Sequence, residues 1–286
     1  MRRALVLSLV GIVALWASSA VFAGLIISQN FDSGTFPVGY QFSSQTTGLG
    51  NSSTTEGLWR VGTGSTPGGS APKPTVSDAH AHSGTKSIVI TRPVDGSDPY
   101  KFEGYTTMTG TPITSGQYVA MSWFYREDYG VNVNWLSFWS YAQDGSSVKP
   151  AAGALVRNLV DPNPGNLAAY KWTGSAYAWE YYNVIIPSNK WFGLALQVDV
   201  SNLQYNLWYN DGSTGWVQVN PNPVAMKSQS YSINRLYYIP AGGYGTKTWI
   251  DDAGWWTGSV VPEPGTFVLL AGGLLGLLCY AWRKRK

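Results

Sequence analysis

The sequence predicts an all-β protein, an antiparallel β-sandwich or jelly roll, lying between two terminal apolar segments. Three observations lead to this prediction. Short segments rich in Trp, Tyr, Val and Ile recur along the chain, separated by clusters of Gly, Pro, Asn, Asp and Ser that favour turns. No stretch of the body shows a sustained helical period. Aromatic residues make up 14% of the chain and charged residues only 12%, which is typical of strand-rich proteins with many turns.

The expected strands follow one another with turn signals between them. Each has β-branched or aromatic residues at alternate or consecutive positions, and residues 210–212 (Asn-Asp-Gly) form a hairpin signal. The stretch 41–75 is poor in apolar residues and predicts long exposed loops around one short strand. In chain order, the expected strands cover residues 25–27, 58–61, 87–91, 118–126, 133–141, 151–160, 177–183, 191–199, 205–209, 216–219, 233–239 and 248–256.

The chain opens with the features of a secretory signal peptide. Two arginines are followed by an apolar stretch at residues 4–16 and then by small residues. Residues 21–23 fit the small-x-small rule for signal peptidase, and residues 18–20 offer a second cleavage site. We therefore expect residues 1–23 to form a signal helix that is cleaved after Ala23; the alternative is an N-terminal anchor that is not cleaved.

The C-terminal segment, residues 260–286, has three parts in a fixed order. Pro262-Glu263-Pro264 comes first, and its two prolines favour an extended backbone. The apolar run 266–282 is near the lower length limit for a transmembrane helix. Four basic residues end the chain and are expected to stay in the cytoplasm.

This order of motif, apolar run and basic tail resembles the PEP-CTERM sorting signal of Gram-negative bacteria. The resemblance implies recognition by the membrane protease-transpeptidase exosortase and processing near Pro262-Glu263-Pro264. It also implies an inner-membrane tether during sorting, followed by release to the cell surface or an extracellular matrix. The alternative is an ordinary C-terminal membrane anchor that is never cleaved.

The body between these segments, residues 24–259, suits one large β-domain, and two small domains are the alternative. Six of the nineteen basic residues lie at the two ends of the chain (Arg2, Arg3 and residues 283–286), so residues 24–282 carry the other thirteen and all sixteen acidic residues, a balance of about −3. This charge does not indicate a nucleic-acid surface. The single cysteine, Cys279, lies in the apolar run, so the exported body has no disulfide. Its stability must come from its core or from bound ions.

Local patterns add a resemblance to two groups of β-sandwich. Residues 189–216 resemble the part of concanavalin A-like (laminin-G-like) sandwiches in which a Trp-led strand hairpins into a strand ending in Asp-Gly. The segment 250–252, Ile-Asp-Asp, resembles the last strand of many carbohydrate-binding jelly rolls. Residues 30–32 and 83–87 fit both groups. The resemblance implies a sandwich and leaves the superfamily open.

In the similar jelly rolls a structural calcium ion joins the first and last strands through acidic side chains and backbone carbonyls. The resemblance therefore implies a structural calcium site with Asp32, Asp251 and Asp252 as ligands, and calcium prefers such oxygen donors. Since neighbours in a strand face opposite sides, only one of Asp251 and Asp252 should point inward. The alternative is that these acids are exposed or cap turns through hydrogen bonds.

Two rows of aromatic residues form the candidate carbohydrate-binding site. Sugars present flat C–H faces that stack on Trp and Tyr rings, while amides such as Gln143, Asn183 and Asn206 can bind the hydroxyl groups. The alternative is that the rings fill the core between two sheets. Alternation predicts that the ring-bearing positions share one face of each strand. They are Trp135, Trp139, Tyr141, Tyr177, Trp179 and Tyr181.

No catalytic constellation is recognised in the sequence. His80 and His82 are the only histidines, and without a third ligand nearby they are interpreted as part of a solvated loop. A Gly-x-Ser-x-Gly nucleophile elbow and the close Glu-x-Asp-x-x-Glu set of sandwich glucanases are both missing. A lyase that uses Tyr and Arg remains open.

The sequence thus predicts an exported, non-catalytic protein that binds glycan or has a structural role at the cell surface or in an exopolysaccharide (biofilm) matrix. Its expected partners are signal peptidase, exosortase, the membrane before processing and an extracellular polysaccharide, and not nucleic acid. The alternatives are a surface polysaccharide lyase or glycoside hydrolase of the same fold, and a purely adhesive matrix protein without sugar specificity.

Overall fold

In a computed structural model of the chain, regular structure is entirely β-strand within the described residues, and every strand pair is antiparallel. The predicted all-β class is confirmed for this part. The expected signal helix 1–23 and the segment 260–286, with its apolar run 266–282, lie outside it. No described helix is long and apolar enough to cross a membrane. The described residues are 25–32, 36–42, 58–61, 72–93, 102–105, 113–127, 135–144, 147–156, 167–229, 231–241 and 245–258.

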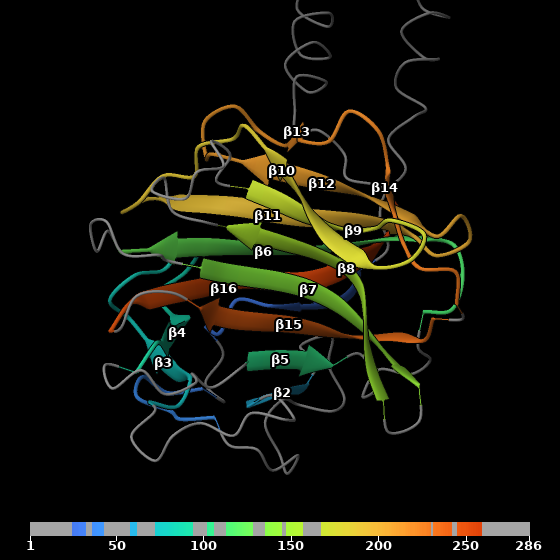
Figure 1. Cartoon of the computed structure of the whole chain (residues 1–286). Coiled ribbons are helices and arrows are strands. Elements are labelled where there is room, and N and C mark those ends of the chain that lie inside the picture. Colours follow the sequence, from blue (N-terminus) through green and yellow to red (C-terminus); the bar gives the residue numbers. More distant parts are fainter. Residues whose placement is uncertain are drawn as a thin grey trace, which may run out of the picture.

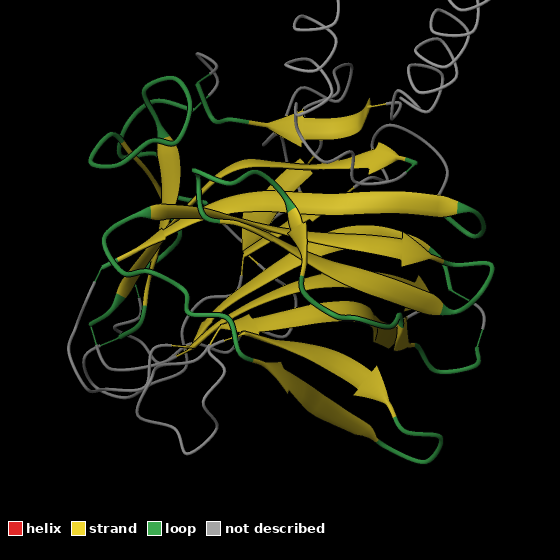
Figure 2. Ribbon diagram, turned by 90° about the horizontal axis from the view of Figure 1, so that it is seen from above, coloured by secondary structure: helices red, strands yellow, loops and turns green. Residues whose placement is uncertain are grey.

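Two antiparallel sheets, A and B, make up the described body (Figures 1 and 2). The strands of sheet A are β1 (Leu25–Gln29), β3 (Thr75–Ser77), β4 (Ser87–Thr91), β6 (Gln117–Arg126), β11 (Trp191–Asp199), β12 (Gln204–Asn210), β13 (Val217–Gln218), β14 (Val224–Ala225) and β16 (Lys247–Thr257). The strands of sheet B are β2 (Leu58–Val61), β5 (Phe102–Tyr105), β7 (Trp135–Asp144), β8 (Ser147–Val156), β9 (Leu167–Trp172), β10 (Tyr177–Tyr182) and β15 (Ile233–Ala241).

The order of strands differs from their order in the chain. Sheet A runs β13-β12-β11-β6-β16-β4-β3, with β1 on β16 and β14 on β12. Sheet B runs β10-β9-β8-β7-β15-β5-β2. In Figure 1, β7 and β15 lie in front of β6 and β16, as expected for two stacked sheets. Most neighbours in sheet A come from distant parts of the chain.

The core fills the space between the sheets because each strand turns its apolar side chains to one side. Phe124 of β6 packs against Phe138 of β7 and Tyr238 of β15, with ring centroids 5.6 and 6.0 Å apart. The buried hydroxyl of Tyr118 on β6 forms a 2.7 Å hydrogen bond with Ser140 on β7. This bond offsets the loss of water around two polar groups and also joins the sheets.

The last strand of the body, β16, occupies the middle of sheet A. One of its edges pairs with β6. Its other edge pairs with β4 at residues 247–250 and with β1 at residues 253–256. Asp251 and Asp252 therefore lie where the partner of β16 changes from β4 to β1.

Candidate functional sites on the two outer sheet faces

Aromatic side chains of β7, β9, β10 and β15 gather on the face of sheet B that points away from the core. Strand pairing places Trp139 of β7 beside Tyr237 of β15, and Tyr170 of β9 beside Trp179 of β10. The neighbouring residue Phe138 points to the opposite side, into the core. We call this surface the sheet B aromatic face. It consists of Trp139, Tyr141, Tyr170, Trp172, Tyr177, Trp179, Tyr181 and Tyr237.

The rings of the sheet B aromatic face contact one another across strands. The centroid of Trp139 lies 4.9 Å from that of Tyr170 and 5.3 Å from that of Trp179. Trp139 lies against Gly153 of β8, where an added Cβ would come within 2.2 Å of the indole ring. The glycine therefore lets Trp139 lie flat on the sheet. Trp139 is buried by its neighbours, whereas Trp179 is only half-buried.

The structure brings together most of the aromatic residues that alternation selected, and their two rows meet on one surface. Trp135 and Gln143 belong to β7, but their side chains lie outside the described part. Asn183 is exposed directly after β10. Asn206 lies on β12 of sheet A, away from this face. The sequence indicated a shared face within each row and carried no signal that the rows would adjoin.

Arg235 of β15 is a buried residue on the same face that sequence reasoning did not select. It pairs across the strands with Tyr141 of β7. Burial raises the pKa of Tyr141, the nearby Tyr170 raises it further, and Arg235 opposes this rise. Tyr141 is therefore a protonated hydrogen-bonding group at neutral pH and is a poor candidate for a catalytic base.

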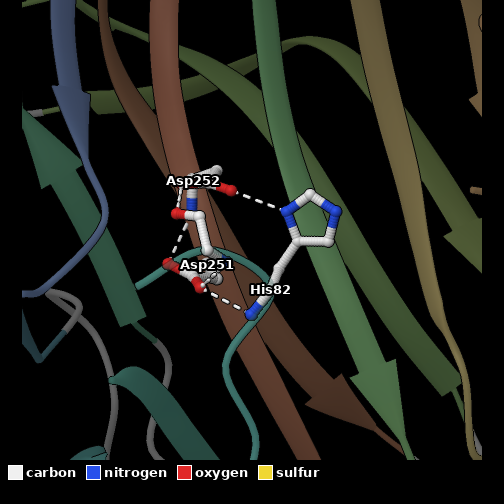
Figure 3. Close-up of polar contacts among 4 residues, drawn as sticks. His82, Asp251 and Asp252 are labelled. Atoms are coloured by element: carbon white, nitrogen blue, oxygen red, sulfur yellow. Dashed lines mark hydrogen bonds and ion pairs between the residues drawn. The ribbon is translucent and has the colours of Figure 1, made fainter. Parts of the chain in front are cut away.

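On the other side of the molecule, carboxylates of β16 hold the loop at residues 79–86. Asp251 accepts hydrogen bonds from the backbone N–H groups of His82 (2.8 Å) and Ser83 (3.1 Å) through one oxygen. One oxygen of Asp252 accepts a 2.6 Å hydrogen bond from the Ser83 hydroxyl. Its other oxygen lies 2.6 Å from Nδ1 of His82 (Figure 3).

A third carboxylate, that of Asp32 just after β1, holds the other end of this loop. Its Oδ1 accepts hydrogen bonds from the backbone N–H groups of Thr85 (2.8 Å) and Lys86 (3.0 Å). Gly84 has a positive φ of 61°, and an added Cβ there would lie 1.5 Å from Asp32 Oδ2. Only glycine fits this close approach. The loop is thus bound by both the first and the last strand regions.

Both carboxylates of β16 reach the same loop because the strand is irregular at this point. Its pairing with β6 shifts register between Asp251 and Gly254, and Asp252 has a positive φ of 45°. Simple alternation would send the two side chains to opposite sides. Asp251 is fully buried beneath the loop, and Asp252 also turns toward it.

Burial sets the protonation behaviour of Asp251. Burial first, and then the charge of Asp252, raises the pKa of Asp251 to about 8. The N–H groups of Ser83, Asp252 and His82 act in the opposite direction because they stabilise the charged form.

The two histidines of the loop lie on aromatic rings of sheet A. The ring of His82 stacks on Trp123 with centroids 3.8 Å apart, and that of His80 stacks on Tyr125 at 3.9 Å. Their edges meet Trp191 and Trp249. The side chain of His82 is 28% exposed. We call this surface the His–aromatic face. It consists of His80, His82, Trp123, Tyr125, Trp191 and Trp249.

From the sequence, His80 and His82 are expected in a solvated loop, with no connection to sheet A. Alternation along β6 does place Trp123 and Tyr125 on one face. Nothing local to the loop indicates that it folds back over those rings. The contact depends on Asp251 and Asp252, which come about 170 residues later in the chain.

The three acids proposed as calcium ligands do meet one loop, but hydrogen-bond donors face them. Oxygens of Asp32, Asp251 and Asp252 point at N–H and O–H groups, which a cation in the same place would repel. Within the described ranges, no group of three or more His, Cys, Asp or Glu residues is arranged to hold a metal ion. Because hydrogen-bond donors face the three carboxylates, their arrangement does not suit calcium. It matches the alternative that these acids cap a loop through hydrogen bonds.

The chain carries a PEP-CTERM protein-sorting motif at its C-terminus, since residues 260–286 match the model of that motif. No curated protein matches the chain.

Several solved structures resemble the chain at low identity. A carbohydrate esterase from Shiga toxin-encoding bacteriophage phi24B is 12% identical, with 83% of this chain and 100% of that chain covered and a TM-score of 0.49. The catalytic domain of a glycoside hydrolase family 131 protein from Coprinopsis cinerea is 11% identical, with coverage of 72% and 86% and a TM-score of 0.46. The exoplasmic/lumenal domain of VIP36, in its Ca2+/Man3GlcNAc-bound form, is 10% identical, with coverage of 64% and 85% and a TM-score of 0.43. Likenesses this weak say nothing of the ligand or activity of this chain.

Proposed function

We propose that the protein is exported, held at the inner membrane of a Gram-negative bacterium during sorting, and delivered by exosortase to the cell surface or the extracellular matrix. The PEP-CTERM motif at residues 260–286 supports this route. The basic N-terminal residues and the apolar segment after them support export by a signal peptide.

At that location we propose that the body binds a polysaccharide through the sheet B aromatic face. The observation that carries this proposal is the gathering of eight Trp and Tyr rings on the outer side of one sheet, with half-buried members such as Trp179 and Tyr177. Rings of this kind combine an apolar face with a polar edge, which suits the C–H faces and hydroxyl groups of sugars. Their mutual packing fixes them before a ligand arrives, so binding would cost little ordering entropy.

The same geometry favours binding over catalysis. Glycosidases need two carboxyl groups facing each other across the scissile bond. Glu180 of β10 forms an ion pair with Lys171 and accepts a hydrogen bond from Tyr182, and both contacts favour a structural role. Tyr141 and Arg235 are the residues that a lyase would need, and they motivate the alternative of a polysaccharide lyase. The raised pKa of Tyr141 counts against it.

A glycan screen with the full chain, purified in detergent, tests the proposed binding. We expect retention of at least one polysaccharide, and we expect Trp179→Ala to weaken it about tenfold, which is ~1.4 kcal/mol. Trp208→Ala is the matched control, because Trp208 is a half-buried tryptophan on the outer side of sheet A. Equal affinity in parent and Trp179→Ala would place the binding elsewhere. No binding to any glycan would favour a purely adhesive role.

The lyase alternative has its own measurement. The full chain is incubated with uronate polysaccharides, and unsaturated sugar ends and new reducing ends are followed. We expect neither. Products that appear with the parent and disappear with Tyr141→Phe would replace the binding proposal with an enzymatic one.

A further inference from the structure

The His–aromatic face carries two histidines that the proposed glycan site does not use. Nδ1 of His82 lies 2.6 Å from Asp252, and its other ring nitrogen, Nε2, lies on the opposite side of the ring (Figure 3). Within the described part of the chain, no hydrogen bond reaches Nε2 of His82 or either ring nitrogen of His80. In a neutral imidazole, a carboxylate at Nδ1 favours the tautomer with the proton on that nitrogen, in which Nε2 carries a lone pair that can bind a metal.

The two imidazoles lie next to each other over one strand. They stack on Trp123 and Tyr125, which are two residues apart on the same face of β6. Positions two apart in a strand are separated by about 6.6 Å. A metal ion that binds two imidazole nitrogens at about 2 Å brings them within roughly 4 Å of each other. To bind the same ion, the His80 ring must turn toward His82, and among the described residues no hydrogen bond holds its ring nitrogens in place.

The surroundings favour a cation that prefers nitrogen ligands. Asp252 and the buried Asp251 place carboxylates beside His82. Among the described residues, neither carboxylate accepts a hydrogen bond from a lysine or an arginine. A carboxylate hydrogen-bonded to the far nitrogen of a metal-binding histidine orients the ring and raises its basicity. Imidazole nitrogen suits copper, zinc and nickel, whereas calcium and magnesium require oxygen ligands.

We propose that His82 and His80 bind a divalent transition-metal ion of the copper and zinc class, with Asp252 as the positioning residue for His82. No third His, Cys, Asp or Glu joins them among the described residues, so water completes the coordination. A site of this kind is open and exchangeable, unlike a closed four-ligand structural zinc site. The proposal is independent of glycan binding, because it concerns the outer side of the other sheet.

Titration of the full chain in detergent with copper(II) sulfate or zinc sulfate tests the site. We expect one ion per chain, tighter binding of copper than of zinc, and no competition by calcium. Copper should quench part of the tryptophan fluorescence, because His82 stacks on Trp123. The copper EPR spectrum should show coupling to imidazole nitrogen. The chain has only two histidines and one cysteine, so Cys279→Ser excludes the thiol as the ligand.

Variants separate the metal ligands from the positioning residue. His82→Asn together with His80→Asn should abolish binding, and Asp252→Asn should weaken it by about 10–100-fold. Asp32→Asn is the control, because the contacts of Asp32 with the described part of the loop are to Thr85 and Lys86 and not to a histidine. Thermal melting confirms that each variant folds. Absence of copper uptake, or uptake that survives both histidine substitutions, overturns the site. Equal losses in Asp252→Asn and Asp32→Asn overturn the role of Asp252.

Discussion

Asp251 is fully buried, and in the described part of the chain its hydrogen bonds come only from backbone N–H groups. In the unfolded chain its pKa should be near 3.9. In the folded protein burial raises this pKa to about 8. At pH values between about 4 and about 8, the folded state keeps a proton on Asp251 that the unfolded state has released. The free energy of unfolding contributed by this group is therefore highest at low pH and falls as the pH rises from about 4 to about 8.

We predict that Asp251→Asn makes this pH dependence shallower. The amide cannot ionise, so the loss of stability with rising pH that comes from this group disappears. Urea unfolding of parent and variant at several values across that range measures the effect. Asp78→Asn serves as a control at an exposed position. Identical slopes in the parent and the Asp251→Asn variant would show that Asp251 does not change its protonation on folding.

The carboxylates around the loop also lead to a prediction about calcium. Asp32, Asp251 and Asp252 already accept hydrogen bonds from the residues at 82–86. We therefore expect EGTA to leave the melting temperature of the full chain unchanged. A lower melting temperature that calcium restores, and magnesium does not, would show that a calcium ion stabilises the protein.

At the scale of single strands, two glycines make room for indole rings on opposite faces of the molecule. An added Cβ at Gly153 of β8 would lie 2.2 Å from Trp139, and one at Gly193 of β11 would lie 2.6 Å from Trp216. We predict that each Gly→Ala substitution destabilises the protein by about 1–3 kcal/mol, because the ring or the strand must move. Urea unfolding at constant pH gives both values.

The same pair of substitutions separates stability from binding. Gly153→Ala should also weaken glycan binding, because Trp139 belongs to the sheet B aromatic face. Gly193→Ala should not, because Trp216 packs on sheet A. If both variants lose glycan affinity to the same extent, the loss reflects general destabilisation and not displacement of Trp139.

What the sequence could predict of these strands depends on how local the signal is. The alternation of side chains depends only on neighbouring residues of one strand, so it correctly placed Trp139 and Tyr141 together on β7. The irregularity at Asp252 is not local, since it occurs where β16 exchanges its partner β4 for β1. The position of the histidine loop depends on that irregularity and was missed for the same reason.

For the whole molecule, composition and turn signals predicted the all-β class of the described part, but they did not predict the order of strands in the sheets. Pairing of β1 with β16 joins residues at the two ends of the body, and no short pattern encodes it. The resulting sandwich has an aromatic surface on each outer side, one built from Trp and Tyr alone and one that also includes His80 and His82. Glycan binding and metal binding are proposed for different surfaces, so substitutions can test each of them separately.

The central place of β16 has a consequence for the order of events during export. A chain that crosses the membrane from its N-terminus presents β1, β4 and β6 long before β16, yet all three pair with it. Sheet A therefore lacks its central strand until residue 257 has crossed the membrane. The PEP-CTERM motif begins at residue 260, directly after this strand. Completion of the sheet and arrival of the sorting motif thus coincide, and a truncated chain lacks both.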